Sequence, residues 1–116
     1  MAGPLRLPRA HEAVIPAEKL VGYALDPDHP RGRHKARVFA AALGIRQPDW
    51  RYLQEQLVQA AASAEVRGTR ITPHGVLYET IVLVDGLNGA TQRVAAIWLV
   101  AQQKPPRLVS TWVDIP

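Results

Sequence analysis

The sequence contains no cysteine, which excludes disulfides and thiolate metal sites. It also has no HExxH motif and no pair of carboxylates at ligand spacing, so it shows no metal signature. No apolar run approaches the ~20 residues that cross a bilayer, and the proline- and charge-interrupted first residues lack the apolar core of a signal peptide. GxSxG and phosphate-loop motifs are missing as well. We therefore expect no metal, no cofactor and no membrane partner for the isolated domain.

The charge that is present lies unevenly along the 116 residues. Residues 1–53 carry nine basic and five acidic side chains, whereas residues 54–116 carry five of each. Eleven of the fourteen cations are arginine, the side chain best suited to bidentate phosphate contacts. This distribution favours nucleic acid or another phosphate-bearing partner, although a solvated arginine-rich face would have the same composition.

The first half of the chain predicts two to three helices. Pro16 and Glu18 suit the first turn of a helix, and the prolines at residues 27 and 30 end it. Gly44 is well placed to end a second helix, whose apolar residues recur at helical spacing. We expect helices over residues 17–25, from residues 32–34 to residue 44, and over residues 49–64.

From residue 75 onward the hydrophobic period changes to two, which indicates β-strands. Asn88-Gly89 is a strong hairpin signal. The predicted fold is α+β, with two to three N-terminal helices packed on a three- to four-stranded twisted antiparallel meander. We expect one domain, with an extended arm over residues 1–12, a helical half over 13–65 and a sheet half over 66–116. The expected strands cover residues 75–84, 92–101 and 108–113, with a connector over 65–73 that contains a short edge strand at 70–72.

The most informative stretch is the basic cluster of residues 31–37, which contains Arg31, Arg33, Lys35 and Arg37 around His34. On a helix, His34 and Arg37 point away from the buried stripe, while Lys35 lies at its boundary. The surrounding cations disfavour the protonated form of His34, so it could act as a base. An ordinary solvated helix N-terminus has the same sequence, and this alternative stays open.

The last predicted strand places Ser110 and Trp112 on one side, where they could share a groove with His34. His74, Tyr78 and Thr80, at the start of the first long strand, are second-tier candidates for binding substrate. A site of histidine, basic, hydroxyl and aromatic side chains without a metal suits RNA cleavage, because RNA supplies its own 2′-OH nucleophile. The protein then needs a base, an acid and cations for the phosphorane, and an aromatic ring can stack on a splayed base.

The order LPRAHEAVIPAEKL, then HPRGRHKARVF, then LNG and PRLVSTW resembles a domain of bacterial toxin systems. The chain is similar over residues 5–113 to the C-terminal ribonuclease toxins of contact-dependent inhibition and other polymorphic toxins. It is also similar to stand-alone toxin–antitoxin relatives, all grouped with the barnase–EndoU–colicin–RelE superfamily. The HPxGxHKAxxF element over residues 29–39 is the most specific part of the resemblance.

The resemblance implies metal-independent cleavage of RNA, with tRNA the expected substrate and a 2′,3′-cyclic phosphate the product. It also implies action in the bacterial cytoplasm, as a stand-alone protein or a delivered part of a larger secreted toxin, and neutralisation by a cognate immunity protein or antitoxin. His34 and Lys35 match the family's histidine and lysine. Ser110 stands where relatives often have threonine, and Trp112 where they often have tyrosine, so a hydroxyl is kept but a phenol is lost.

We thus expect a catalytic set of His34, Lys35, Arg37 and Ser110, with Arg31, Arg33, His74, Tyr78, Thr80 and Trp112 binding substrate. The alternative is a non-catalytic module that binds nucleic acid or a protein partner through charge, such as an antitoxin-like or inactive relative.

Overall fold

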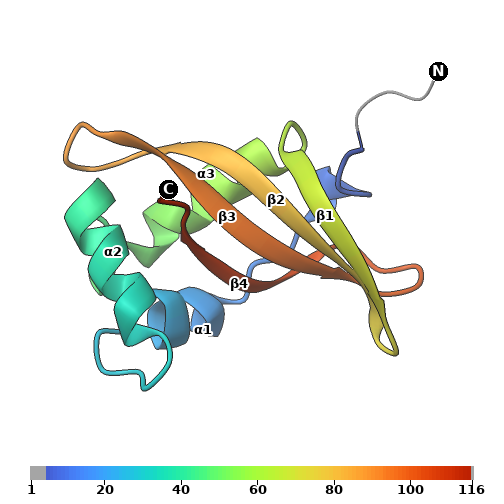
Figure 1. Ribbon diagram of the computed structural model, residues 1–116, viewed down its shortest axis with the longest axis horizontal. Helices are drawn as coiled ribbons and strands as arrows, with labels where there is room; N and C mark the ends of the chain where they lie inside the picture. Colours follow the sequence, from blue (N-terminus) through green and yellow to red (C-terminus); the bar gives the residue numbers. More distant parts are fainter. Residues whose placement is uncertain (1–4, 116) are drawn as a thin grey trace.

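The protein folds as helices packed against one four-stranded antiparallel sheet, and the computed structural model describes residues 5–115 (Figure 1). The strands are hydrogen-bonded in the order β1-β2-β3-β4, which is the predicted meander. The helical segments come first in the chain and the strands follow. The predicted α+β class is therefore confirmed. No helix within the described residues has the length and apolar character needed to cross a membrane.

Short helical segments fill the first half of the chain. A single turn, α1 (Ala17–Lys19), continues as a π-helical turn over Leu20–Ala24. The longer helices are α2 (Arg33–Leu43), which ends at Gly44 with φ 66°, and α3 (Trp50–Ala61). These segments lie where the sequence predicted three helices. The first differs in kind, because its last turn is π-helical, a feature frequent at functional sites.

The sheet consists of β1 (Glu65–Thr72), β2 (Gly75–Asp85), β3 (Thr91–Val100) and β4 (Arg107–Val113). The expectation of a connector over residues 65–73 with a short edge strand was wrong, because β1 pairs with β2 along nearly this whole stretch. Most β1 side chains are exposed, and the register shifts between Val66 and Gly68. A strand exposed on both faces has no alternation of apolar and polar residues, so periodicity could not reveal it.

An ion network holds the edge strand β1 to the rest of the sheet. The guanidinium of Arg67 contacts the carboxylate of Glu79 on β2 and makes two bonds, of 3.0 and 3.2 Å, to the carboxylate of Asp114 after β4. Arg93 on β3 adds a contact of 3.6 Å to Asp114. The network therefore links all four strands of the sheet.

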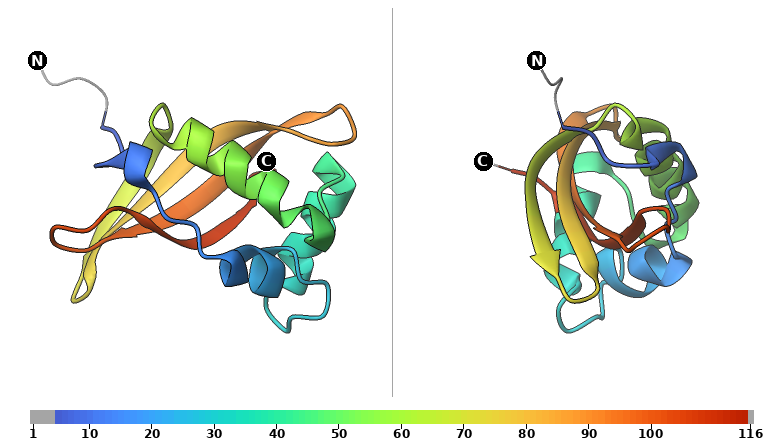
Figure 2. Two further views of the ribbon diagram at one scale, coloured as in Figure 1. Left: turned by 180° about the vertical axis from the view of Figure 1, so that it is seen from behind. Right: turned by 90° about the vertical axis from the view of Figure 1, so that its right-hand side faces the viewer.

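The core lies between the helices and the inner face of the sheet. Helix α3 crosses this face, while α1 and α2 gather at one end of the sheet beside β4 (Figure 2). Phe39 of α2 and Trp98 of β3 are among the largest fully buried side chains. The hydroxyl of Thr80 accepts a hydrogen bond of 2.9 Å from the Trp98 indole and donates one to the carbonyl of Ala96.

The described part of the predicted arm, residues 5–12, packs onto this core. Leu7 and Ala10 are buried, and Ala10–Glu12 forms a 3₁₀ turn. Val14 then pairs in parallel with Arg107 at the start of β4. Residues 1–4 of the predicted arm lie outside the described residues.

Candidate functional site

The ammonium group of Lys35 joins three elements at the end of the sheet beside α2. Its Nζ donates to the hydroxyl of Tyr23 at 2.7 Å and to the hydroxyl of Ser110 at 3.0 Å. Lys35 comes from the first turn of α2, Tyr23 from the π-helical turn and Ser110 from β4. A lysine ammonium has three donors. Two are used here, so one N–H is available to a ligand.

A tight turn before α2 brings Lys35 to Tyr23. The Nδ1 atom of His29 accepts hydrogen bonds of 2.9 Å from the backbone N–H groups of both Arg31 and Gly32. The His29 ring also packs edge-on against the Tyr23 ring, with centroids 4.9 Å apart. A side chain at residue 32 would place its Cβ 2.0 Å from the carbonyl oxygen of Tyr23. Glycine at this position is therefore required for α2 to approach Tyr23 so closely.

Two aromatic rings flank the Lys35 ammonium, which lies 4.6 Å from the centroid of Tyr23 and 5.8 Å from that of Trp112. Both distances fall in the range of cation–π attraction. Beside them is an open hollow of about 490 Å³, which is lined by His34, Lys35, Val38, Trp112 and Val113. His34 is exposed at this hollow, so its imidazole is accessible to a bound molecule.

The cluster changes the acidity of the Tyr23 phenol. The hydrogen bond from Lys35 is the main cause of a lowered Tyr23 pKa, and the Lys35 charge, the hydrogen bond with Ser110 and the charge of Arg31 act in the same direction. Partial burial opposes this shift. Because the donors favour the phenolate, Tyr23 gives up its proton more readily than an ordinary tyrosine.

Chemically, the cluster offers hydrogen-bond donors and one positive charge to an anion in the hollow. The free N–H of Lys35 and the hydroxyls of Ser110 and Tyr23, whose oxygens already accept from Lys35, can each donate to a ligand. His34 and the acidified Tyr23 can exchange protons with it. Such a set suits the binding and transformation of a phosphodiester. Within residues 5–115, no three histidine, aspartate or glutamate side chains gather closely enough to hold a metal ion.

The structure brings four of the predicted site residues together, namely His34, Lys35, Ser110 and Trp112. Arg37 and Arg33 lie on α2 beside a separate hollow. Arg31 is exposed in the turn and acts on Tyr23 through its charge.

The three candidates at the start of β2 lie elsewhere. The β1–β2 hairpin, which carries His74, is at the end of the sheet away from α2 (Figures 1 and 2). Tyr78 is half-buried and packs against the core, and Thr80 is buried with both of its hydrogen bonds made inside the protein. Neither lines the hollow beside Lys35.

Sequence reasoning missed Tyr23, which lies in the first predicted helix and was not among the candidate site residues. Its hydroxyl reaches the cluster because the helix ends in a π turn and because Gly32 lets α2 approach. The available signal was a tyrosine at a helix end followed, after a proline turn, by a glycine and then a lysine. That signal is weak without the tertiary structure.

Comparison with known proteins adds a family and a fold. A family model described as "Domain of unknown function (DUF6883)" matches residues 6–114. No curated protein is matched. Among solved structures, the chain is similar to one from the "Contact-dependent growth inhibition toxin - immunity protein complex from Klebsiella pneumoniae 342", with a TM-score of 0.72 and 15% identity. The similarity covers 87% of this chain and 99% of that one, so the two share a fold.

Proposed function

We propose that this chain, which belongs to the family described as a domain of unknown function (DUF6883), is a metal-independent endoribonuclease toxin. The observation that carries the proposal is the Lys35 ammonium held between the Tyr23 and Ser110 hydroxyls, beside His34 and Trp112 in one hollow. These side chains are those of acid–base chemistry at a phosphodiester. In the reaction, a ribose 2′-oxygen attacks the adjacent phosphorus, and the bond to the 5′-oxygen breaks to leave a 2′,3′-cyclic phosphate.

Each group of the site has a part in this reaction. Lys35 and Ser110 hold the non-bridging oxygens and stabilise the negative charge that grows on the phosphorane. One proton leaves the 2′-hydroxyl and another arrives at the departing 5′-oxygen, so a base and an acid are needed. We assign these transfers to His34 and Tyr23, the two groups of the cluster that can exchange protons. The lowered pKa of Tyr23 makes its phenol give up a proton more readily than an ordinary tyrosine.

Trp112 supplies a flat surface on which an unstacked base can rest. The resemblance implies that relatives often have tyrosine at this position, and here Tyr23, from another element, brings a phenol to the same cluster. The choice of tRNA as substrate rests on the resemblance alone. The exposed cation of Arg31 beside the site favours a polyanion of this kind.

The structural likeness supports the expectation of a protein partner. The related complex is one of a toxin with an immunity protein. For a toxin of this type we expect a cognate immunity protein or antitoxin that covers the Lys35 hollow, and action inside a target bacterium after delivery.

The same likeness supports a second candidate function. The related complex contains both a toxin and an immunity protein, and a fold shared at 15% identity carries neither role across. A non-catalytic immunity-type or nucleic-acid-binding protein would use the basic surface of α2 for binding alone. This candidate predicts salt-sensitive binding without cleavage.

Incubation of the purified protein with total RNA in excess EDTA tests the proposal. We expect discrete tRNA fragments that end in 2′,3′-cyclic phosphates. Lys35→Met should abolish them, whereas Lys104→Gln, which removes a charge from the exposed β3–β4 loop, should not. Intact RNA with a correctly folded protein would overturn the enzyme assignment and favour the binding role.

A further inference from the structure

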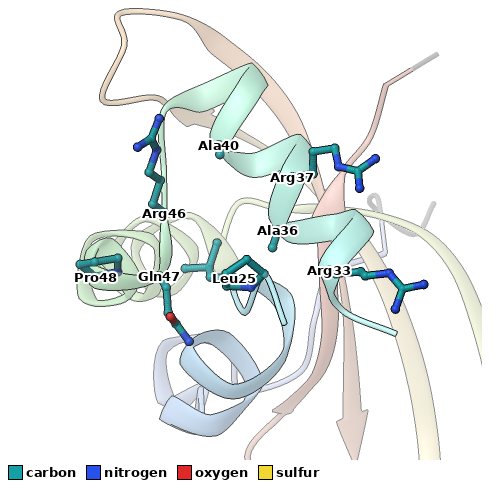
Figure 3. A pocket seen from close by; sticks show the side chains of 9 residues that line it. Leu25, Arg33, Ala36, Arg37, Ala40, Arg46, Gln47 and Pro48 are labelled. Atoms are coloured by element: carbon teal, nitrogen blue, oxygen red, sulfur yellow. The ribbon is translucent and has the colours of Figure 1, made fainter. Parts of the chain in front are cut away.

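Helix α2 borders a second hollow, separate from the one beside Lys35. It measures about 560 Å³, and its apolar surface comes from Leu25, Pro27, Ala36, Ala40 and Pro48. Three arginines belong to its lining: Arg33 and Arg37 extend from one side of α2, and Arg46 rises on the other side of the Ala36–Ala40 stripe (Figure 3). We call this hollow the arginine groove.

The charges of the arginine groove are not neutralised within the described protein. None of the three guanidiniums forms an ion pair with a carboxylate in residues 5–115. Two carboxylates next to the groove in sequence, those of Asp49 and Asp26, accept hydrogen bonds from the backbone instead. Asp49 accepts from the N–H of Arg46, and Asp26 accepts from that of Asp28. Three exposed and unpaired arginines around an apolar surface therefore form a site suited to an anion with an apolar part.

The composition of the groove matches a nucleotide better than a simple anion. Guanidiniums bind phosphate through two parallel hydrogen bonds and also stack on bases. Arg33 and Arg37 are one helical turn apart, so their Cβ atoms lie about 5–6 Å from each other and both guanidiniums leave the same side of α2 (Figure 3). The alanine and proline surface between the arginines leaves room for a base or ribose. A volume of 560 Å³ lies within the usual range of small-ligand sites, about 300–1,000 Å³.

The position of the groove relates it to the Lys35 site. Around α2, the exposed face passes from Lys35 and His34 to Arg37 and Arg33, and then to the groove. A helix with its side chains is about 10–12 Å across. Single-stranded RNA at ~3.4 Å per stacked nucleotide spans this width with roughly three nucleotides. One strand can therefore occupy both hollows.

We propose that the arginine groove binds nucleotides of single-stranded RNA a few positions away from the phosphate held at Lys35. This inference rests on the proposed function for the link to the reacting phosphate, but the binding itself does not require cleavage. The strand crosses the N-terminal half of α2. The arginines neutralise its phosphates, and the apolar surface takes a base.

Binding of an uncleavable RNA tests the groove separately from catalysis. The probe is a fluorescent, fully 2′-O-methylated single-stranded oligonucleotide of about 12 nucleotides, which lacks the nucleophilic 2′-OH. Its affinity is measured by anisotropy over a range of salt concentrations for the wild type and for Arg33→Gln/Arg37→Gln/Arg46→Gln. The matched control is Lys104→Gln, and an Arg46→Gln single variant serves if the triple variant fails to fold.

We expect the triple variant to bind on the order of tenfold more weakly, with the slope of log K against log salt reduced by about 2, since each phosphate contact contributes roughly 0.7. The Arg46→Gln variant should reduce the slope by about a third as much as the triple variant does. The Lys104→Gln control should match the wild type. Wild-type binding by the triple variant would overturn the inference. RNA binding that depends on the arginines in a protein that cleaves nothing would support the groove while refuting the proposed enzyme.

Discussion

The ammonium of Lys35 lies 2.7 Å from the hydroxyl of Tyr23, a residue from the preceding helical turn rather than from the sheet. The hydroxyl of Ser110, on β4, accepts a second hydrogen bond from the same ammonium. The site is thus built where three separate elements meet, and its geometry depends on how α2 docks against the first helical segment. This dependence gives predictions about chemistry and about packing.

Lys35→Met should remove most of the catalytic rate while leaving the fold intact. The substitution keeps an unbranched apolar stem but deletes the charge that faces the phosphorane. Loss of one such electrostatic group commonly lowers kcat by about 10²–10³. The measurement is single-turnover cleavage of tRNA, with thermal unfolding as the control for structure. Ser110→Ala should have the smaller effect of the two, and an active Lys35→Met protein would refute the central role of the ammonium.

Tyr23 should ionise at lower pH than an ordinary tyrosine, because Lys35 donates to its oxygen and lowers its pKa. Phenolate absorbance titrations of the wild type and Tyr23→Phe give its curve by difference. In Lys35→Met the Tyr23 curve should move to higher pH, since the largest cause of the shift is gone. A folded-state pKa below the unfolded value of ~10 means that Tyr23 adds stability above that value. This contribution is lost as pH falls through the folded pKa. An unmoved curve would contradict the coupling.

Helix α2 and the long hairpins follow from local rules that the sequence displays. The apolar spacing of α2 ends at Gly44, whose φ of 66° only glycine adopts readily. Asn88-Gly89 marks the β2–β3 turn, where Gly89 has φ 86°. In contrast, β1 has no hydrophobic face of its own and is held by pairing with β2 and by Arg67. Nothing local could show that strand at its full length.

The site was predictable only in part, because some of its contacts depend on tertiary structure and leave no local signal in the sequence. Residues near one another in sequence, such as His34 and Lys35, are visible as a motif, and period two places Ser110 and Trp112 on one side of β4. The Tyr23–Lys35 contact depends on a π turn and on a tertiary approach. Periodicity also places Tyr78 and Thr80 on one face of a strand but does not say which face meets the core.

Gly32→Ala should disturb the site through packing. The added Cβ would lie 2.0 Å from the Tyr23 carbonyl oxygen, so α2 must move away from the first helical segment. Overpacking of this kind costs about 1–3 kcal/mol of unfolding free energy. We also expect a loss of cleavage larger than stability alone explains, because Lys35 is displaced from Tyr23. Gly68→Ala is the matched control, since nothing lies within 4 Å of its added Cβ. Denaturant unfolding and single-turnover cleavage check both effects, and equal behaviour of the two variants would refute the packing argument.

Thr80→Val separates a structural role from a substrate-binding one. Valine has nearly the same shape but leaves the buried Trp98 indole N–H without its acceptor. An unsatisfied buried donor costs about 1–3 kcal/mol, which denaturant unfolding can measure. RNA affinity at a temperature where the variant is folded should match the wild type. The exposed Thr69→Val on β1 controls for the change of residue type and should be nearly neutral. Weaker RNA binding with unchanged stability would instead support contact between Thr80 and substrate.

Asp114→Asn should lower the melting temperature near neutral pH and lose its effect in acid. The hydrogen bonds from Arg67 are the main cause of a lowered Asp114 pKa, and the charges of Arg67 and Arg93 add to it. Because the folded-state pKa lies below the unfolded value of ~3.9, the carboxylate adds stability above that pH. The contribution is lost as pH falls through the folded pKa. The melting temperatures of Asp114→Asn and the wild type should therefore converge as the pH falls from neutral into acid.

The control is Asp28→Asn, at an exposed carboxylate without an ion pair in the described chain. Its melting temperature should follow that of the wild type throughout. A constant gap between the Asp114→Asn and wild-type curves would show that the network acts through something other than this charge.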